Sequence, residues 1–175
     1  MYKRQPYSSP SSFALNPRFL DIDNLIEENF IFISNPQELG PTNQNKSNFD
    51  FDVADNLTKK LGHLLLQCWS SQAEERKLAF NKWISKNSWI EDYATFVVIR
   101  EEFNMLPWWE WPKEFKIKNN KFLKSWIKGK SDKILIEKLI QWHLDEQWRA
   151  IKKFAKIYNV KLIGDLPFYV SRDSA

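Results

Sequence analysis

The sequence has 175 residues, of which 43% are hydrophobic and 27% charged, as in a folded globular chain and unlike a disordered tail. A single cysteine excludes an internal disulfide, and the net charge of +4 is modest. The first residues lack a signal peptide, and no apolar run reaches the roughly 18–20 residues of a membrane span. We therefore expect a cytoplasmic protein with no membrane partner.

The first third of the chain contains mostly loop signals. Residues 1–17 are rich in Ser and Pro and predict a loop, and residues 34–48 carry two prolines and several Asn, typical of a surface connection. Between them, residues 18–29 favour one short helix.

Apolar stripes at spacings of three and four predict four longer helices, at residues 52–69, 73–86, 89–103 and 131–158. Ser131 and Asp132 supply an N-cap for the last helix. Leu78 belongs to the stripe of the second helix. The last helix has an expected buried line of Ile136, Ile140, Leu144, Trp148, Ile151, Ala155 and Tyr158.

The hydrophobic period changes near the end of the chain. Residues 160–163 read as a short buried strand, and a Gly-Asp-Leu-Pro turn follows it. A helix leading directly into a strand is half of an α/β unit. Because one strand cannot form a sheet, the sequence predicts a piece of a larger α/β protein, with strands missing before and after it.

Two carboxylates follow the expected strand. Asp165 stands at its C-terminal end, where barrel and doubly wound folds hold their active sites, and Asp173 comes eight residues later. They could orient sugar hydroxyls or pair with an arginine. Asp also favours turns and N-caps, so a structural role stays open.

A proline-bounded loop at residues 106–112 holds Trp108, Trp109 and Trp111, with Glu110 between them. An exposed indole can stack on a sugar ring while a neighbouring carboxylate accepts hydroxyls. Buried rings that pack under the loop are the alternative, since Trp is highly buried on average.

Other candidate chemistries find little support. Seven lysines between residues 113 and 130 form a basic stretch, which we interpret as a solvated surface and not a nucleic-acid site. His63 and His143 lack metal-ligand spacing, and Cys68 has no partner pattern. Nucleotide and phosphate motifs are absent, so neither a metal nor a cofactor is expected.

Residues 164–175 resemble a motif of the 4-α-glucanotransferases, the amylomaltase or disproportionating-enzyme family (glycoside hydrolase family 77). The family motif reads Gly-Asp-x-Pro-Ile-x-Val-Ala-x-Asp-Ser-Ala, and this chain departs from it at Phe168 and Ser171. Further blocks resemble the family in the same order, at residues 6–17, 91–96, 109–112 and 147–155.

The resemblance implies a fragment of a (β/α)₈ TIM barrel, an α/β fold. Residues 1–17 would be the loop after the second barrel strand. Residues 18–159 would be mostly a helical insertion between strands two and three, with the helix leading to strand three. Residues 160–175 would be strand three and the start of its active-site loop.

The resemblance also implies transfer of α-1,4-glucan segments between maltooligosaccharides or starch- and glycogen-derived glucans, with retention. The family's nucleophilic Asp and acid/base Glu would lie beyond Ala175, so this chain holds no catalytic residue and is expected to be inactive alone. Its substrate-binding or supporting residues would be Tyr7, Asp165, Asp173, Trp109 and Trp111. Asp165 would pair with the arginine that precedes the nucleophile. If the chain comes from a plant or an alga, the protein would lie in the plastid stroma.

Two other classes remain. One is a non-catalytic helical module that binds glucan or another protein, and the other is a basic nucleic-acid-binding domain. The strand and loop at the end favour the enzyme, because a self-contained helical module has no use for a lone buried strand.

Overall fold

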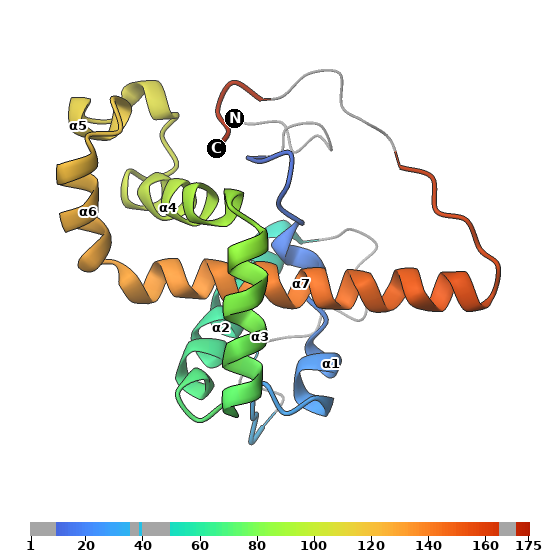
Figure 1. Ribbon diagram of the computed structural model, residues 1–175. Coiled ribbons are helices and arrows are strands. Elements are labelled where there is room, and N and C mark those ends of the chain that lie inside the picture. Colours follow the sequence, from blue (N-terminus) through green and yellow to red (C-terminus); the bar gives the residue numbers. More distant parts are fainter. Residues whose placement is uncertain (1–9, 36–38, 40–49, 165–170) are drawn as a thin grey trace.

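The computed structural model describes residues 10–35, 39, 50–164 and 171–175, and over these residues it is helical, with no strand (Figure 1). The elements in chain order are the 3-10 helix η1 (Pro17–Phe19), α1 (Ile22–Glu27), α2 (Phe51–Trp69), α3 (Glu74–Lys86), α4 (Trp89–Glu102), the 3-10 helix η3 (Trp108–Glu110), α5 (Lys113–Lys116), α6 (Asn120–Lys128) and α7 (Ser131–Ile157).

Helix α7 lies at the centre of the fold and packs chiefly against α2 and α4 (Figure 1). Its approach to α2 depends on a glycine, because a Cβ atom on Gly62 would lie 2.6 Å from Cγ2 of Ile136. Leu61 and Leu65 of α2 and Leu139 of α7 are buried in the same core. The N-terminal half of α7 is therefore enclosed on several sides.

The four longer helices are confirmed as α2, α3, α4 and α7, with ends shifted by a few residues. The single helix at residues 18–29 is wrong: η1 and α1 are separate, and the Asp21 carboxylate accepts from the Asn24 N–H at 3.2 Å to begin α1. The cap of α7 is wrong as well, since Lys130 occupies that position without a side-chain bond. Leu78 on α3 is 67% exposed and not buried.

Helices α5 and α6 form in the basic stretch, where no helix is expected from the sequence. Aromatic contacts stabilise them. The Phe115 ring lies 5.1 Å from that of Phe103, which directly follows α4, and 5.4 Å from that of Trp126 on α6. This second small core places the lysines outside and the rings inside.

The C-terminal half of α7 is largely uncovered. Ile136, Ile140, Leu144 and Ala155 are buried as expected, but Ile151 is 53% and Tyr158 65% exposed, and Trp148 is exposed too. Figure 1 shows this half extending beyond the other helices. The predicted buried line is therefore wrong from Trp148 onward, Ala155 excepted, because no described element packs there.

Residues 160–163, expected as a strand, form no strand in the described part of the chain. Helix α7 ends in a Schellman motif, in which Asn159 has φ 55° and the Val160 N–H donates to the Ala155 carbonyl at 2.8 Å. The chain then runs without ladder bonds, and Ile163 is 97% exposed. A strand needs a neighbouring strand for its hydrogen bonds, and the described residues supply none.

Two glutamines of α7 hold the N-terminal segment. Gln141, 1% exposed, accepts from the Leu15 N–H and donates to the Leu15 carbonyl, both at 2.9 Å. Gln147 makes the same pair of bonds to Asp21, both at 3.0 Å. Each amide thus satisfies both backbone polar groups of one residue, and the segment lies along α7.

We expect Gln141→Leu to lower the free energy of unfolding by about 1–3 kcal/mol, because it leaves the backbone groups of Leu15 without partners in a buried place. Gln147→Leu is the matched control and should cost less, since water reaches the Asp21 backbone. Urea denaturation measures both values. Equal losses would contradict the importance of burial at Gln141.

His143 is a core residue. It is 3% exposed, and its ring lies 4.3 Å from that of Phe30 and 4.7 Å from that of Trp142. Burial, with a smaller effect from the positive charge of Arg76, lowers the pKa of His143 to about 3. The imidazole is thus a neutral packing group.

This burial predicts a pH effect. Because the pKa of folded His143 lies below its usual 6.5, the unfolded chain takes up a proton first as the pH falls. The resulting loss of stability begins near pH 6.5 and reaches about 2 kcal/mol at pH 5. His143→Gln should remove this loss, so its free energy of unfolding should gain about that amount relative to wild type between pH 7 and pH 5.

Denaturation at pH 7 and at pH 5 measures this change in the free energy of unfolding. His63→Gln, which removes an exposed histidine of α2, is the control and should follow the wild-type profile. If the free energy of unfolding changed with pH in the same way for His143→Gln and wild type, a buried neutral imidazole would be contradicted.

Candidate functional site

The tryptophan loop, residues 106–112, rests on the second small core. Trp111 is 5% exposed, its indole N–H donates to the Leu106 carbonyl at 2.9 Å, and its ring lies 5.3 Å from that of Phe96. Packing under the loop is therefore what the structure shows for Trp111, which supports the loop from below. Trp109 is only half-buried.

The C-terminal segment, residues 171–175, lies against this loop. The Trp108 indole N–H donates to the Arg172 carbonyl at 2.8 Å, and the Trp108 backbone N–H donates to Oδ1 of Asp173 at 3.2 Å. One tryptophan thus binds two consecutive residues of the segment. The sequence gives no signal for this contact, because the partners are far apart in the chain.

Asp173 faces the protein interior. It is 3% exposed, and its Oδ2 lies 2.8 Å from Nη2 of Arg100 near the end of α4. Its own backbone N–H donates to the Ser171 hydroxyl at 3.3 Å. The sequence left several roles open for the Asp173 carboxylate, and the structure shows one of them, pairing with an arginine.

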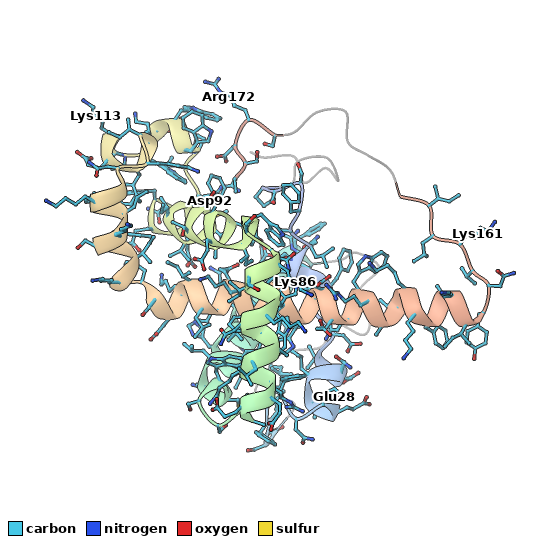
Figure 2. All side chains as sticks on the ribbon, viewed as in Figure 1. Glu28, Lys86, Asp92, Lys113, Lys161 and Arg172 are labelled. Atoms are coloured by element: carbon cyan, nitrogen blue, oxygen red, sulfur yellow. The ribbon has the colours of Figure 1, made fainter. Side chains whose placement is uncertain are left out.

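Arg172, in contrast, is exposed and stacks on the tryptophan loop. Its guanidinium carbon lies 4.5 Å from the centre of the Trp109 ring. Figure 2 shows Arg172 on the same side of the molecule as Lys113, which begins α5, and Lys161 on the opposite side. We call Trp109 and Arg172 the Trp–Arg surface. It combines an aromatic ring with several N–H donors, which suits a polyhydroxylated ligand.

The N-terminal segment reaches the same region. The Ala175 N–H donates to the Pro10 carbonyl at 2.8 Å, and the Ser11 hydroxyl accepts from the backbone N–H groups of Phe13 and Ala14. The blocks at residues 6–17 and 164–175 thus meet where both are described. Tyr7 and Asp165 lie outside the described residues.

Glu137 is an acid that the sequence does not single out. Burial between helices, with the charge of Glu101 adding to the effect and that of Lys59 opposing it, raises the pKa of Glu137 to about 7. Glu101 itself pairs with Lys59 at 3.0 Å and with Lys133 at 3.5 Å. Such ion-pair networks perturb pKa values without catalysis, so the raised pKa of Glu137 by itself does not indicate an active site.

One hollow in the described part of the chain lies at the end of α7. It has a volume of about 310 Å³ and carries no acid among its lining residues, which are Lys152, Ala155, Lys156, Asn159, Val160, Lys161 and Leu162. Within the described ranges, no three His, Cys, Asp or Glu side chains gather as metal ligands would, and no helix has the length and apolarity to cross a membrane.

Comparisons with known proteins agree with the sequence resemblance. The chain is 29% identical to a 4-alpha-glucanotransferase of Clostridium butyricum, over 99% of this chain and 35% of that protein. It is also 29% identical to a chloroplastic/amyloplastic 4-alpha-glucanotransferase of rice (Oryza sativa), over 97% of this chain and 28% of that protein. The chain thus spans about a third of the length of such relatives.

The fold has a solved counterpart. An amylomaltase of Streptococcus agalactiae, solved in complex with acarbose, matches with a TM-score of 0.86 and 24% identity, over 97% of this chain and 34% of that one. The predicted fold family, that of a TIM-barrel enzyme, is confirmed. The family model described as 4-alpha-glucanotransferase matches residues 1–175. This chain therefore belongs to the 4-alpha-glucanotransferase family.

Proposed function

We propose that this chain is the part of a 4-α-glucanotransferase that borders the glucan groove. The whole enzyme would transfer α-1,4-glucan segments between maltooligosaccharides or starch- and glycogen-derived glucans, with retention of configuration. One observation carries the proposal: the family match extends over all 175 residues. The solved relative bound to acarbose, a sugar-like ligand, agrees with a carbohydrate substrate.

Retaining transfer requires a nucleophilic carboxylate and an acid/base carboxylate about 5–5.5 Å apart. By the family resemblance both lie beyond Ala175, and neither Glu137 nor Glu110 takes their place. The contribution of this chain is binding and support. Trp109 would contact glucan and Trp111 would support it, while Tyr7 and Asp165 would serve at the cleft and near the nucleophile.

The arrangement of the chain supports a place within a barrel. We assign residues 1–17 to the loop after the second strand, 18–159 mostly to the helical insertion, and 160–175 to strand three and its loop. The exposed side chains of Ile151, Ile157 and Ile163 agree with this assignment, because an apolar surface of this kind is suited to packing against further protein. The cytoplasm, or the plastid in a plant, is the proposed location.

A non-catalytic glucan-binding module is the second candidate. It is favoured by the helical structure of the described residues and by the exposed Trp–Arg surface, which needs no reacting group. The two candidates differ in whether the complete protein transfers glucan segments.

We expect the 175-residue chain alone not to disproportionate maltotriose, since a covalent glycosyl intermediate needs the absent carboxylates. Purified chain would be incubated with maltotriose, and glucose and longer maltodextrins sought by chromatography. A chimera in which this chain replaces the matching third of the Clostridium butyricum relative should form both products. Transfer by the 175-residue chain itself, free of host enzyme, would contradict the assignment. A folded but inactive chimera would favour the binding module.

We expect Trp109→Ala to weaken maltoheptaose binding by the chain about two- to tenfold, because stacking of an aromatic ring contributes about 0.5–1.5 kcal/mol. Trp148→Ala is a matched control: that indole is exposed and, like Trp109, has a cation over its ring, with Lys152 5.7 Å from the ring centre, but it lies on α7. Titration followed by the indole N–H resonances measures both affinities. Equal effects of the two variants would show that binding is not specific to the tryptophan loop.

A further inference from the structure

The ion pair of Arg100 and Asp173 is the most buried of those in the described residues. The Arg100 side chain is 15% exposed and that of Asp173 only 2%, whereas the Arg18–Asp55 pair has values of 24% and 44%. A surface pair contributes little to stability, but loss of one partner from a buried pair leaves an uncompensated charge. The position of Asp173 is therefore tightly constrained.

Both carboxylate oxygens of Asp173 have contacts inside the protein. Oδ2 lies against Arg100, and Oδ1 accepts the backbone N–H of Trp108. The carbonyl of the preceding residue, Arg172, accepts the Trp108 indole N–H. Three contacts from α4 and the tryptophan loop thus fix two consecutive residues of the C-terminal segment.

Fixing the backbone at Arg172 places its side chain within reach of Trp109. The guanidinium group lies over the ring, while the Arg172 carbonyl is bonded to Trp108 and the next residue, Asp173, pairs with Arg100. The exposed Trp–Arg surface therefore depends on the buried pair beneath it.

We propose that Arg100 and Asp173 are positioning residues, which hold the C-terminal segment so that Arg172 and Trp109 form one preorganised surface. The inference rests on the proposed function, in which this surface meets glucan. Asp173 then acts through Arg172 and Trp109 and does not itself contact sugar. Preorganisation of this kind raises affinity, because the segment is already ordered in the free protein and binding does not have to order it.

Hydrogen exchange in the 175-residue chain tests the pair directly. Asp173→Asn removes the charge while keeping an oxygen for the Trp108 N–H, and Arg100→Gln removes the other partner. Each should speed exchange about 100-fold in residues 106–111 and 171–175, with little change in the buried part of α7. The double variant should be no faster than either single one, because both break the same interaction.

Two further variants control the experiment. Arg100→Lys retains a cation and should speed exchange by less than about tenfold. Asp55→Asn breaks a bidentate arginine pair on α2 and should leave both segments at the wild-type rate. Wild-type exchange in Asp173→Asn and Arg100→Gln, or additive effects in the double variant, would overturn the proposal.

Maltoheptaose titration separates positioning from direct contact. Positioning predicts that Asp173→Asn and Arg100→Gln weaken binding equally, by about two- to tenfold as for Trp109→Ala, and that the double variant binds no more weakly than either single variant. Weakening by Asp173→Asn alone would instead assign the carboxylate to the sugar and overturn the proposal. If wild type itself binds no maltoheptaose, the proposed function loses its support here, while hydrogen exchange still decides whether the pair positions the segment.

Discussion

Helix α7 carries apolar side chains along its whole length but is covered only along its first half, and the rest of the structure follows from this constraint. Where α2 and α4 cover it, the fit is close enough to require Gly62 opposite Ile136. Beyond Leu144 the described chain supplies little cover: Gln147 binds Asp21 and Ala155 is buried, but Ile157 stands 70% exposed. The structure therefore has one enclosed end and one open end, joined by a single continuous helix.

At the enclosed end, the chain is organised by side chains that bind backbone. Gln141 holds Leu15, Trp108 holds Arg172, and the Pro10 carbonyl accepts from Ala175. Segments without regular structure need such partners, since buried backbone groups without them are costly. These bonds bring the first and last described residues beside the tryptophan loop, which explains how distant blocks of the sequence contribute to one region.

The helices could be predicted from the sequence because their apolar period is a local property. Which apolar side chains of a helix are buried could be predicted only where another element covers the helix. Ile140 and Trp148 share one stripe, yet only Ile140 is buried. The same reason explains the missing strand at residues 160–163, whose bonds need a neighbour. Pairing of Asp173 with an arginine was one of the roles left open by the sequence, but Arg100 could not be identified as the partner, because the residues that enclose Asp173 come from a helix and a loop far along the chain. Tyr7 came from the family resemblance alone and Asp165 first from its place after the expected strand, and both lie outside the described residues.

The two ends suit different roles for physical reasons. A surface that is to bind a flexible sugar chain benefits from rigidity, and the enclosed end is held by contacts among its polar groups: Trp111 donates inward, Asp173 forms an ion pair with Arg100, and the Arg172 carbonyl accepts from Trp108. The open end has the opposite character, with apolar side chains and a hollow lined by lysines and no acid. An exposed apolar surface of this kind favours association with further protein over binding of a polar ligand. This contrast agrees with our proposal, in which glucan binds at the tryptophan loop and further protein packs at the far end of α7.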